Sequence, residues 1–135
     1  MMLLFLGFIF QLVSRSSSSN VMANPICGFV ASTNIETIYS EWSCYSNQTS
    51  VTDSCDWEGI KCKHDGDITE LDLLSHSLSG TISPELGDLL AMTKLSISHS
   101  NLNGTIPSAL ESLVALQDLV LYNNDLSGPI PSALG

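Results

Sequence analysis

The chain has few basic residues: four Lys and Arg stand against 14 Asp and Glu, which gives a formal charge of −10. Binding to a phosphate backbone or to an anionic membrane depends on clustered Lys and Arg. This scarcity argues against a nucleic-acid-binding protein and against a protein that docks on anionic lipid. Hydrophobic residues make up 44% of the 135 residues, which argues against disorder and is compatible with one folded domain.

Catalytic motifs are also missing from the sequence. It has no G-x-S-x-G segment, no Gly-rich phosphate loop, no H-E-x-x-H and no C-x-x-C pair. Its Ser, His and Asp residues are scattered along the chain. We therefore expect no catalytic residues, no cofactor and no metal, and a protein that is not an enzyme.

The hydrophobic run near the start is too short for a transmembrane helix, which needs about 20 apolar residues. Leu3–Val13 instead has the length of a secretory hydrophobic region, and the small residues before position 24 suit cleavage after Ala23. We predict a signal peptide over 1–23 and a secreted, extracellular protein. An uncleaved anchor or a buried core helix is the alternative.

All the cysteines lie in the first half of the chain: Cys27, Cys44, Cys55 and Cys62. An even count in a secreted chain indicates disulfides, with three possible pairings. Gly59 can supply a tight bend between Cys55 and Cys62, so we predict that these two are paired and that the other two are paired with each other. A zinc site of Cys55, Cys62 and His64 is the alternative, although this spacing matches no common zinc pattern.

The second half of the chain repeats with a period of 24 residues in three copies without a gap. The copies start at Leu71, Leu95 and Leu119, and their glycine column is Gly80, Gly104 and Gly128. Each Leu-x-Leu predicts a short strand with both leucines on one side, and the strands of successive copies should stack as a parallel sheet. Because no copy can bury its apolar stripe alone, the stack must form the core.

Other segments, both within the copies and before them, have residue patterns that predict local structure. We expect a sharp bend at each column glycine and a helical turn or 3₁₀ segment within 108–116. Ile35, Ile38, Tyr39 and Trp42 follow i, i+3, i+4, i+7 spacing, which predicts an amphipathic helix over the open end of the first copy. A ligand-binding helix is the alternative, and Trp57 should fill the core beside it.

The pattern L-x-L-x-x-N-x-L-x-G-x-I-P resembles the plant-type leucine-rich repeat, and Cys-Asp-Trp-Glu-Gly-Ile-Lys-Cys at 55–62 resembles the cap of plant leucine-rich-repeat receptor-like kinases and receptor-like proteins. The resemblance implies an α/β solenoid, a right-handed leucine-rich repeat with short parallel strands on its concave face. It places a disulfide-bridged N-terminal cap over 24–66 and repeats over 67–135. The chain departs from the pattern at its Asn column, where His76 and Ser100 precede Asn124, and at Ser83, where Pro is usual.

The strand residues between the inward leucines should face outward on the concave side. The expected partner-binding residues are Glu70, Asp72, Leu74, Lys94, Ser96, Ser98, His99, Asp118, Val120 and Tyr122. Because stacked strands lie about 4.8 Å apart, Glu70, Lys94 and Asp118 should form a ladder of alternating sign. Solvated residues with weak cross-strand pairing are the alternative interpretation.

The resemblance implies a receptor-type ectodomain fragment that binds a protein or peptide ligand or a co-receptor ectodomain. The alternative is a secreted inhibitor of a cell-wall-degrading enzyme, similar to polygalacturonase-inhibiting proteins, which share this repeat. A kinase domain, if the gene has one, is not in this chain. The third copy stops at Gly135 with an open apolar edge, so we expect a fragment that is marginally stable or self-associates.

The sequence contains two N-glycosylation sequons, Asn47-Gln48-Thr49 and Asn103-Gly104-Thr105. In a secreted chain both are candidate glycan acceptors. Asn47 lies in a polar loop between cysteines, and Asn103 follows an inward leucine at an expected exposed turn. We predict glycosylation at both asparagines.

Overall fold

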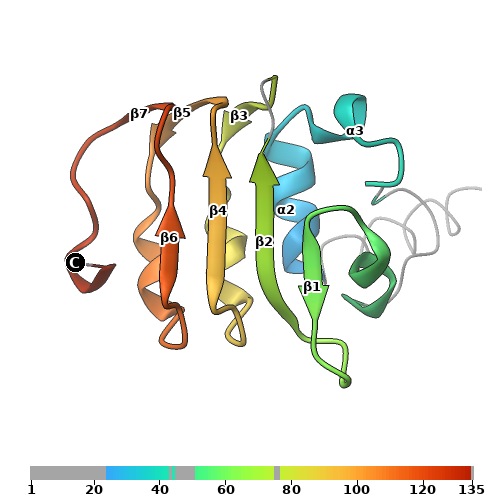
Figure 1. Cartoon of the computed structure of the whole chain (residues 1–135). Coiled ribbons are helices and arrows are strands. Elements are labelled where there is room, and N and C mark those ends of the chain that lie inside the picture. The colour runs from blue at the N-terminus through green and yellow to red at the C-terminus, as the bar shows by residue number, and fades with distance from the viewer. Residues whose placement is uncertain (1–23, 43, 45–50, 75–76, 135) are drawn as a thin grey trace, which may run out of the picture.

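The chain forms a helical cap followed by stacked coils, each made of a strand, a second strand and a 3₁₀ helix (Figure 1). The structure is a computed structural model that describes residues 24–42, 44, 51–74 and 77–134. The predicted signal peptide, the Asn47 sequon and His76 therefore lie outside the described residues. Among the helices in these ranges, none has the length and apolar character to cross a membrane.

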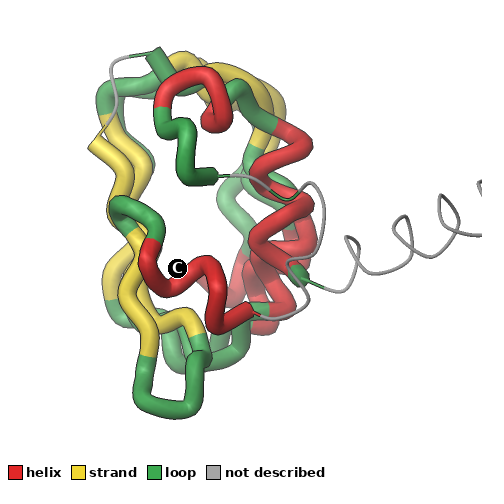
Figure 2. Tube along the Cα trace, turned by 90° about the vertical axis from the view of Figure 1, so that its right-hand side faces the viewer, coloured by secondary structure: helices red, strands yellow, loops and turns green. Residues whose placement is uncertain are grey.

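Successive coils contain the same elements in the same order. The first has β2 (Ile68–Leu74), β3 (Ser79–Thr81) and η2 (Pro84–Asp88). The second has β4 (Lys94–Ser98), β5 (Asn101–Thr105) and η3 (Ser108–Ser112), and the third has β6 (Asp118–Val120), β7 (Asp125–Ser127) and η4 (Ser132–Leu134). Viewed along the stack, strands lie along the left side and across the top of the coils, and most helical segments lie on the right (Figure 2). The 3₁₀ segment predicted within 108–116 is confirmed as η3.

The Leu-x-Leu segments form the predicted sheet, with strand order β1-β2-β4-β6. β2, β4 and β6 are parallel, and Leu71, Leu95 and Leu119 are paired in register. β1 (Ile60–Cys62) adds antiparallel to β2 at the edge next to the cap. Leu71 and Leu95 are fully buried. The repeat starts are thus adjacent rungs on the core side of one sheet.

The sequence does not predict the second sheet, β3-β5-β7, which forms where we expected only a bend. Its strands are parallel, with Ser79 paired to Asn101 and Asn103 paired to Asp125. Gly104 lies inside β5 with a φ of 78°, a left-handed conformation that residues with a Cβ rarely adopt. The glycine column therefore bends the chain as predicted, and the segments beside the bends pair with each other.

The core is the space enclosed by the coils, and the repeat leucines fill it. Its fully buried members include Leu71, Leu73, Leu78, Leu86, Met92, Leu95, Ile97, Leu102 and Leu110. In the third coil, Leu119, Leu121 and Leu126 are only partly buried. Burial therefore depends on a neighbouring coil on each side, as the stacking of repeats requires.

The cap begins with α2 (Pro25–Ser32), a helix that we did not expect from the sequence. Its start nevertheless has a readable signal, because the Asn24 side chain accepts a hydrogen bond from the Ile26 N–H at 3.1 Å and Pro25 occupies the first turn. Ile26 and Phe29 are fully buried, and α2 packs against η2 of the first coil. This helix closes the open end of the stack.

The amphipathic helix predicted from Ile35 to Trp42 is wrong in extent. α3 covers only Ile35–Ile38, and the extended backbone of Tyr39 ends it. Trp42 lies beyond the helix but is fully buried, and its indole Nε1 donates to the Glu58 carbonyl oxygen at 3.1 Å. The apolar spacing correctly predicts which residues pack in the core. The first coil is covered by α2 and a loop, and not by the expected helix.

Both predicted disulfides are present in the cap. They join Cys27 to Cys44 and Cys55 to Cys62, with Cα–Cα distances of 5.7 and 5.6 Å. The zinc alternative is wrong because its two cysteines are bonded to each other. Trp57 is buried, as predicted, and its ring centroid lies 5.0 Å from that of Trp42.

The cap contacts the first coil through backbone at Gly80. Thr33 forms an antiparallel bridge with Gly80, and the Ser32 hydroxyl donates to the Thr81 carbonyl oxygen at 2.9 Å. The Asn34 Oδ1 accepts from the Ser79 N–H at 2.7 Å. A Cβ on Gly80 would lie 2.1 Å from the Ser32 carbonyl oxygen. Only glycine allows so close an approach between the cap and the coil.

Leu95→Ala should strongly destabilise the fold, because Leu95 is fully buried at the centre of the stack. We expect a loss of about 2–5 kcal/mol in the free energy of unfolding, measured by urea denaturation. Leu74→Ala is the matched control, because the Leu74 side chain is 62% exposed. Similar losses for both variants would contradict the assignment of Leu95 to the core.

Gly80→Ala should lower the thermal midpoint more than Gly104→Ala. Both glycines have positive φ, 119° at Gly80 and 78° at Gly104, so backbone strain contributes to both variants and contributes more at Gly80. At Gly104 the nearest atom to an added Cβ is the Thr81 Cγ2 at 3.4 Å, an ordinary contact. The midpoints are measured by calorimetry, and equal shifts would show that neither the contact with the cap nor the larger φ of Gly80 matters.

Candidate functional site

The candidate site is the solvent-facing side of the β1-β2-β4-β6 sheet, which we call the strand face. Because side chains alternate along a strand, the residues between the buried leucines point to this side. The register brings Glu70, Lys94 and Asp118 into one row and Asp72, Ser96 and Val120 into the next. The structure therefore brings most of the predicted partner-binding residues onto one surface.

Charged residues occupy the part of the strand face near the strand starts. Lys61 on β1 donates to the Glu70 carboxylate at 2.7 Å, and Lys94 forms an ion pair with Asp72. The predicted ladder of Glu70, Lys94 and Asp118 is present in register, but Lys94 pairs diagonally with Asp72 instead of straight across. The two lysines therefore neutralise part of an otherwise acidic surface.

The Asp72–Lys94 pair shifts the pKa of both groups. The hydrogen bond from Lys94 holds the pKa of Asp72 below its usual value, with a smaller contribution from Ser96. The same hydrogen bond raises the pKa of Lys94. Both charges are thus favoured at neutral pH, although exposed ion pairs contribute little to stability.

Ser96 and Ser98 are corrections to the predicted binding set. Their exposed fractions are only 7% and 2%, so neither offers a free surface to a partner. Ser96 lies in register between Asp72 and Val120, and Leu74 lies in register beside Ser98. A small side chain that lies between larger ones in the same row is covered by them. Such burial cannot be predicted from the alternation of residues along a single strand.

Apolar and aromatic side chains gather near the strand ends. Leu74 is 62% and Tyr122 54% exposed, and Val120 is half-buried. The rings of His99 and Tyr122 meet edge to face with centroids 4.9 Å apart, and the Asn123 amide nitrogen lies 3.0 Å from the His99 Nδ1. His99 and Asn123, which are equivalent by the repeat, both have left-handed φ, at 53° and 55°. The exposed aromatic group is therefore held in place by its neighbours.

The Asn column of the repeat has a structural role beside this group. In the third coil, the Asn124 amide nitrogen donates to the carbonyl oxygens of Ile97 and Leu121 at 2.8 and 3.1 Å. Its Oδ1 accepts from the Leu102 N–H at 3.1 Å. In the second coil Ser100 is buried and donates to the Ser98 carbonyl oxygen. The two described members of this column, Ser100 and Asn124, thus satisfy backbone groups in the turn.

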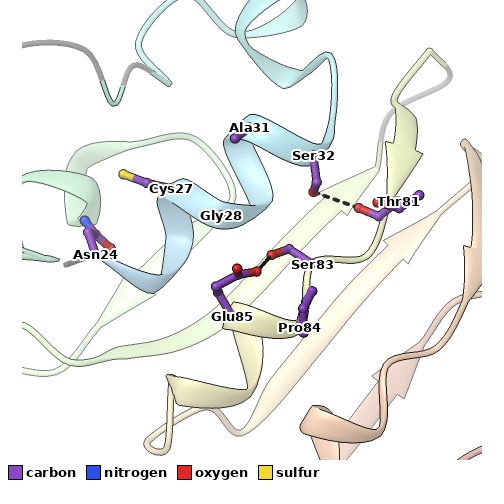
Figure 3. Close-up of a pocket in the computed structure, with 9 residues that line it drawn as sticks. All are labelled: Asn24, Cys27, Gly28, Ala31, Ser32, Thr81, Ser83, Pro84 and Glu85. Atoms are coloured by element: carbon purple, nitrogen blue, oxygen red, sulfur yellow. Dashed lines mark hydrogen bonds between the residues drawn. The ribbon is translucent and has the colours of Figure 1, made fainter. Parts of the chain in front are cut away.

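A pocket of about 370 Å³ lies on the opposite side, between α2 and the first coil (Figure 3). Ser83, which stands where the repeat usually has Pro, donates to the Glu85 carboxylate and keeps the pKa of Glu85 below its usual value. A Cβ on Gly28 would lie 2.8 Å from the Ser83 Oγ, so α2 and this segment are in close contact. Within the described ranges, no group of three or more His, Cys, Asp and Glu side chains is arranged to hold a metal ion.

Comparisons with known sequences identify the repeats. Residues 91–113 and 115–135 match the family model of the Leucine Rich Repeat. A putative leucine-rich repeat receptor-like serine/threonine-protein kinase of Arabidopsis thaliana is 33% identical over 87 residues, covering 62% of this chain and 8% of that protein. Protein MALE DISCOVERER 2 of the same plant is 41% identical over 49 residues, covering 36% of this chain and 7% of that protein. The chain thus spans only a small part of each of these relatives.

Solved structures confirm the expected fold class. The BIR2 ectodomain of Arabidopsis thaliana is 30% identical with a TM-score of 0.70, covering 82% of this chain and 59% of that one. The SOBIR1 receptor kinase ectodomain is 32% identical with a TM-score of 0.53, covering 57% and 48%. The GASSHO1/SCHENGEN3 ectodomain, solved with CASPARIAN STRIP INTEGRITY FACTOR 2, is 40% identical with a TM-score of 0.55, covering 60% and 10%.

Asp72→Asn should make stability depend less on pH. The lowered pKa of Asp72 adds stability above its unfolded value of about 3.9, and this is lost as pH falls through the folded pKa. The raised pKa of Lys94 adds stability below about 10.4, and this is lost as pH rises through the folded pKa. We expect a small decrease in the urea midpoint near neutral pH that fades at both extremes.

Asp118→Asn is the control for this prediction. Asp118 is exposed on the same row as Lys94, but it forms no ion pair among the described residues. Across the pH range, the urea midpoint of Asp118→Asn should stay closer to that of the unaltered protein than the midpoint of Asp72→Asn does. A difference for Asp72→Asn that persists well below the folded pKa of Asp72 would exclude the ion pair as its cause.

Proposed function

We propose that this leucine-rich repeat protein, which is related to the ectodomains of plant receptor-like kinases, is an extracellular protein-recognition module. Its ligand is a peptide or the ectodomain of a co-receptor. The chain acts by binding and not by catalysis. Whether alone or as part of a longer receptor, it presents the strand face to its partner.

The observation that supports this proposal most is the composition of the strand face. An exposed aromatic and apolar group, formed by Leu74, Tyr122 and His99, lies next to a row of charges. Buried aromatic anchors surrounded by polar contacts are typical of binding hot spots. Because His99 packs against Tyr122, the Tyr122 ring is already ordered before a partner binds.

The size of the strand face limits what it can bind alone. A standard interface buries about 800 Å² on each partner, and three short parallel strands supply only part of that area. A short extended peptide fits this face, whereas a folded co-receptor would also contact residues outside it. Acidic residues outnumber lysines on the face, so a ligand with a basic residue beside an apolar one is favoured.

The cap supports an extracellular location. Its two disulfides are stable in an oxidising compartment such as the cell exterior and are rare in the cytosol. The predicted signal peptide over 1–23 would deliver the chain there. We therefore place the protein outside the cell, or at the cell surface if it belongs to a longer receptor.

Tyr122→Ala should weaken binding to a cognate partner at least about tenfold, because a hot-spot residue contributes about 2 kcal/mol or more. Biolayer interferometry with the BIR2, SOBIR1 and GASSHO1/SCHENGEN3 ectodomains and with CASPARIAN STRIP INTEGRITY FACTOR 2 provides a first panel of partners. Leu90→Ala is the matched control, because Leu90 is 60% exposed but lies outside the strands. Equal losses for the two variants would contradict the strand face as the binding surface.

The same preparation separates this function from inhibition of a cell-wall-degrading enzyme. A polygalacturonase assay with pectin as substrate measures inhibition directly. Inhibition without binding to any ectodomain or peptide of the panel would favour the inhibitor. Binding that Tyr122→Ala abolishes, with pectin hydrolysis unchanged, would favour the receptor module.

A further inference from the structure

We infer that Asn103 on β5 is an N-glycan acceptor, and that its glycan lies over the β3-β5-β7 sheet and leaves the strand face open. The inference rests on the proposed secretion of the chain, since the glycan donor is met only in the secretory pathway. Asn103 begins the sequon Asn103-Gly104-Thr105. A sequon is required for N-glycosylation but does not show that its asparagine is accessible. The structure shows that the Asn103 residue is exposed.

The side chain of Asn103 differs from most described asparagines in having no structural task. Four others are held by hydrogen bonds to the cap, the first coil or the turns: Asn24, Asn34, Asn123 and Asn124. Asn103 is exposed, and no described residue forms a hydrogen bond with its side chain. Its amide nitrogen can therefore be modified without removing a contact that the fold uses.

The surroundings of Asn103 leave room for a glycan. Asn103 and Thr105 are two residues apart on β5 and both are exposed, so the amide and the hydroxyl of the sequon are accessible together. In register beside Asn103 lie Thr81 and Asp125, which are exposed polar residues of modest size. Gly104, which lies between Asn103 and Thr105, has no side chain that could cover the Asn103 amide.

The modification is a group transfer from a lipid-pyrophosphate-linked oligosaccharide. The Asn103 Nδ2 forms a bond to the anomeric carbon of the first sugar, and the bond from that carbon to the pyrophosphate oxygen breaks. The lipid pyrophosphate leaves with the bonding electron pair, and one amide proton is lost to the enzyme's base. The Asn103 carbonyl is kept, so no oxidant or reductant is needed.

The position of Asn103 determines which surface the glycan covers. Asn103 belongs to the second sheet, whereas Leu74 lies on β2 and Tyr122 follows β6, both strands of the first sheet. A glycan on β5 therefore shields the exposed polar rows of the second sheet. A partner that binds the strand face should bind the glycosylated and the deglycosylated protein equally well.

The test expresses the full chain in plant cells and treats the secreted protein with PNGase A in ¹⁸O-labelled water. Deglycosylation converts a glycosylated asparagine to labelled aspartate, so peptide mass spectrometry identifies the site. We expect the label at Asn103, its loss in Thr105→Ala and its retention in Thr105→Ser. A secreted protein with unlabelled Asn103 overturns the inference.

Asn101 supplies the matched control, because it is exposed on the same strand but begins no sequon. Asn101→Gln should leave the glycan in place, whereas Asn103→Gln should remove it. Asn103→Thr destroys the sequon at 103 and creates Asn-Leu-Thr at 101–103 on the same side of β5. We expect the label to move to Asn101, and its absence from both positions would show that this side of the strand is inaccessible.

A second arm separates failure of the site from failure of secretion. Residues 24–135 follow a proven foreign signal peptide in place of residues 1–23, so entry into the secretory pathway no longer depends on the chain's own leader. Label at Asn103 in this arm alone supports the acceptor and contradicts the proposed natural secretion. Unlabelled Asn103 in secreted protein from both arms overturns the acceptor and leaves the proposed location intact.

Discussion

The structure depends on the burial of one coil's apolar side by the next coil. A single coil has a short strand, a second strand and a 3₁₀ helix, and none of these is stable alone. Leu71, Leu95 and Leu119 lie in one row because the 24-residue period returns the chain to the same point. Each interface between coils therefore contributes both core and sheet pairing, and stability is shared along the stack.

The cap solves the same problem at the end of the stack by different means. α2 and the buried tryptophans cover the first coil, and the two disulfides hold a region that is too small for a large core. The contact at Gly80 lets the backbone of the cap pair directly with the first coil. This closed end supports the strand face, because β1 extends the sheet from the cap.

Much of the fold can be predicted because it follows from periodicity. The leucine column predicts the first sheet and its register, and the spacing around Cys55 and Cys62 predicts their disulfide. The second sheet could not be predicted, because Ser79–Thr81 has no apolar alternation and pairs only through its backbone. The apolar spacing after residue 34 predicts the cap helix there, whereas the longer helix is α2, whose start is signalled only by Asn24 and Pro25.

The candidate site is predictable to a lesser degree. Alternation along the strands places Leu74, Lys94 and Tyr122 on one surface, as the structure shows. It cannot predict the burial of Ser96 and Ser98, because exposure depends on the size of side chains in neighbouring strands. The edge-to-face packing of His99 on Tyr122 also requires the fold, since the two residues belong to different coils.

The pairing registers of the two sheets differ, and this difference determines the shape of the stack. The first sheet pairs residues a full repeat apart, as in Glu70 with Lys94, whereas the second pairs Ser79 with Asn101, two residues short of a repeat. Equivalent residues in the second sheet are therefore displaced by about 6.6 Å along the strand, at about 3.3 Å per residue. A pure translation cannot satisfy both sheets, so each coil must rotate relative to the last. An array of such coils would wind as a spiral staircase, and a long ligand lying on it would have to follow a helical path.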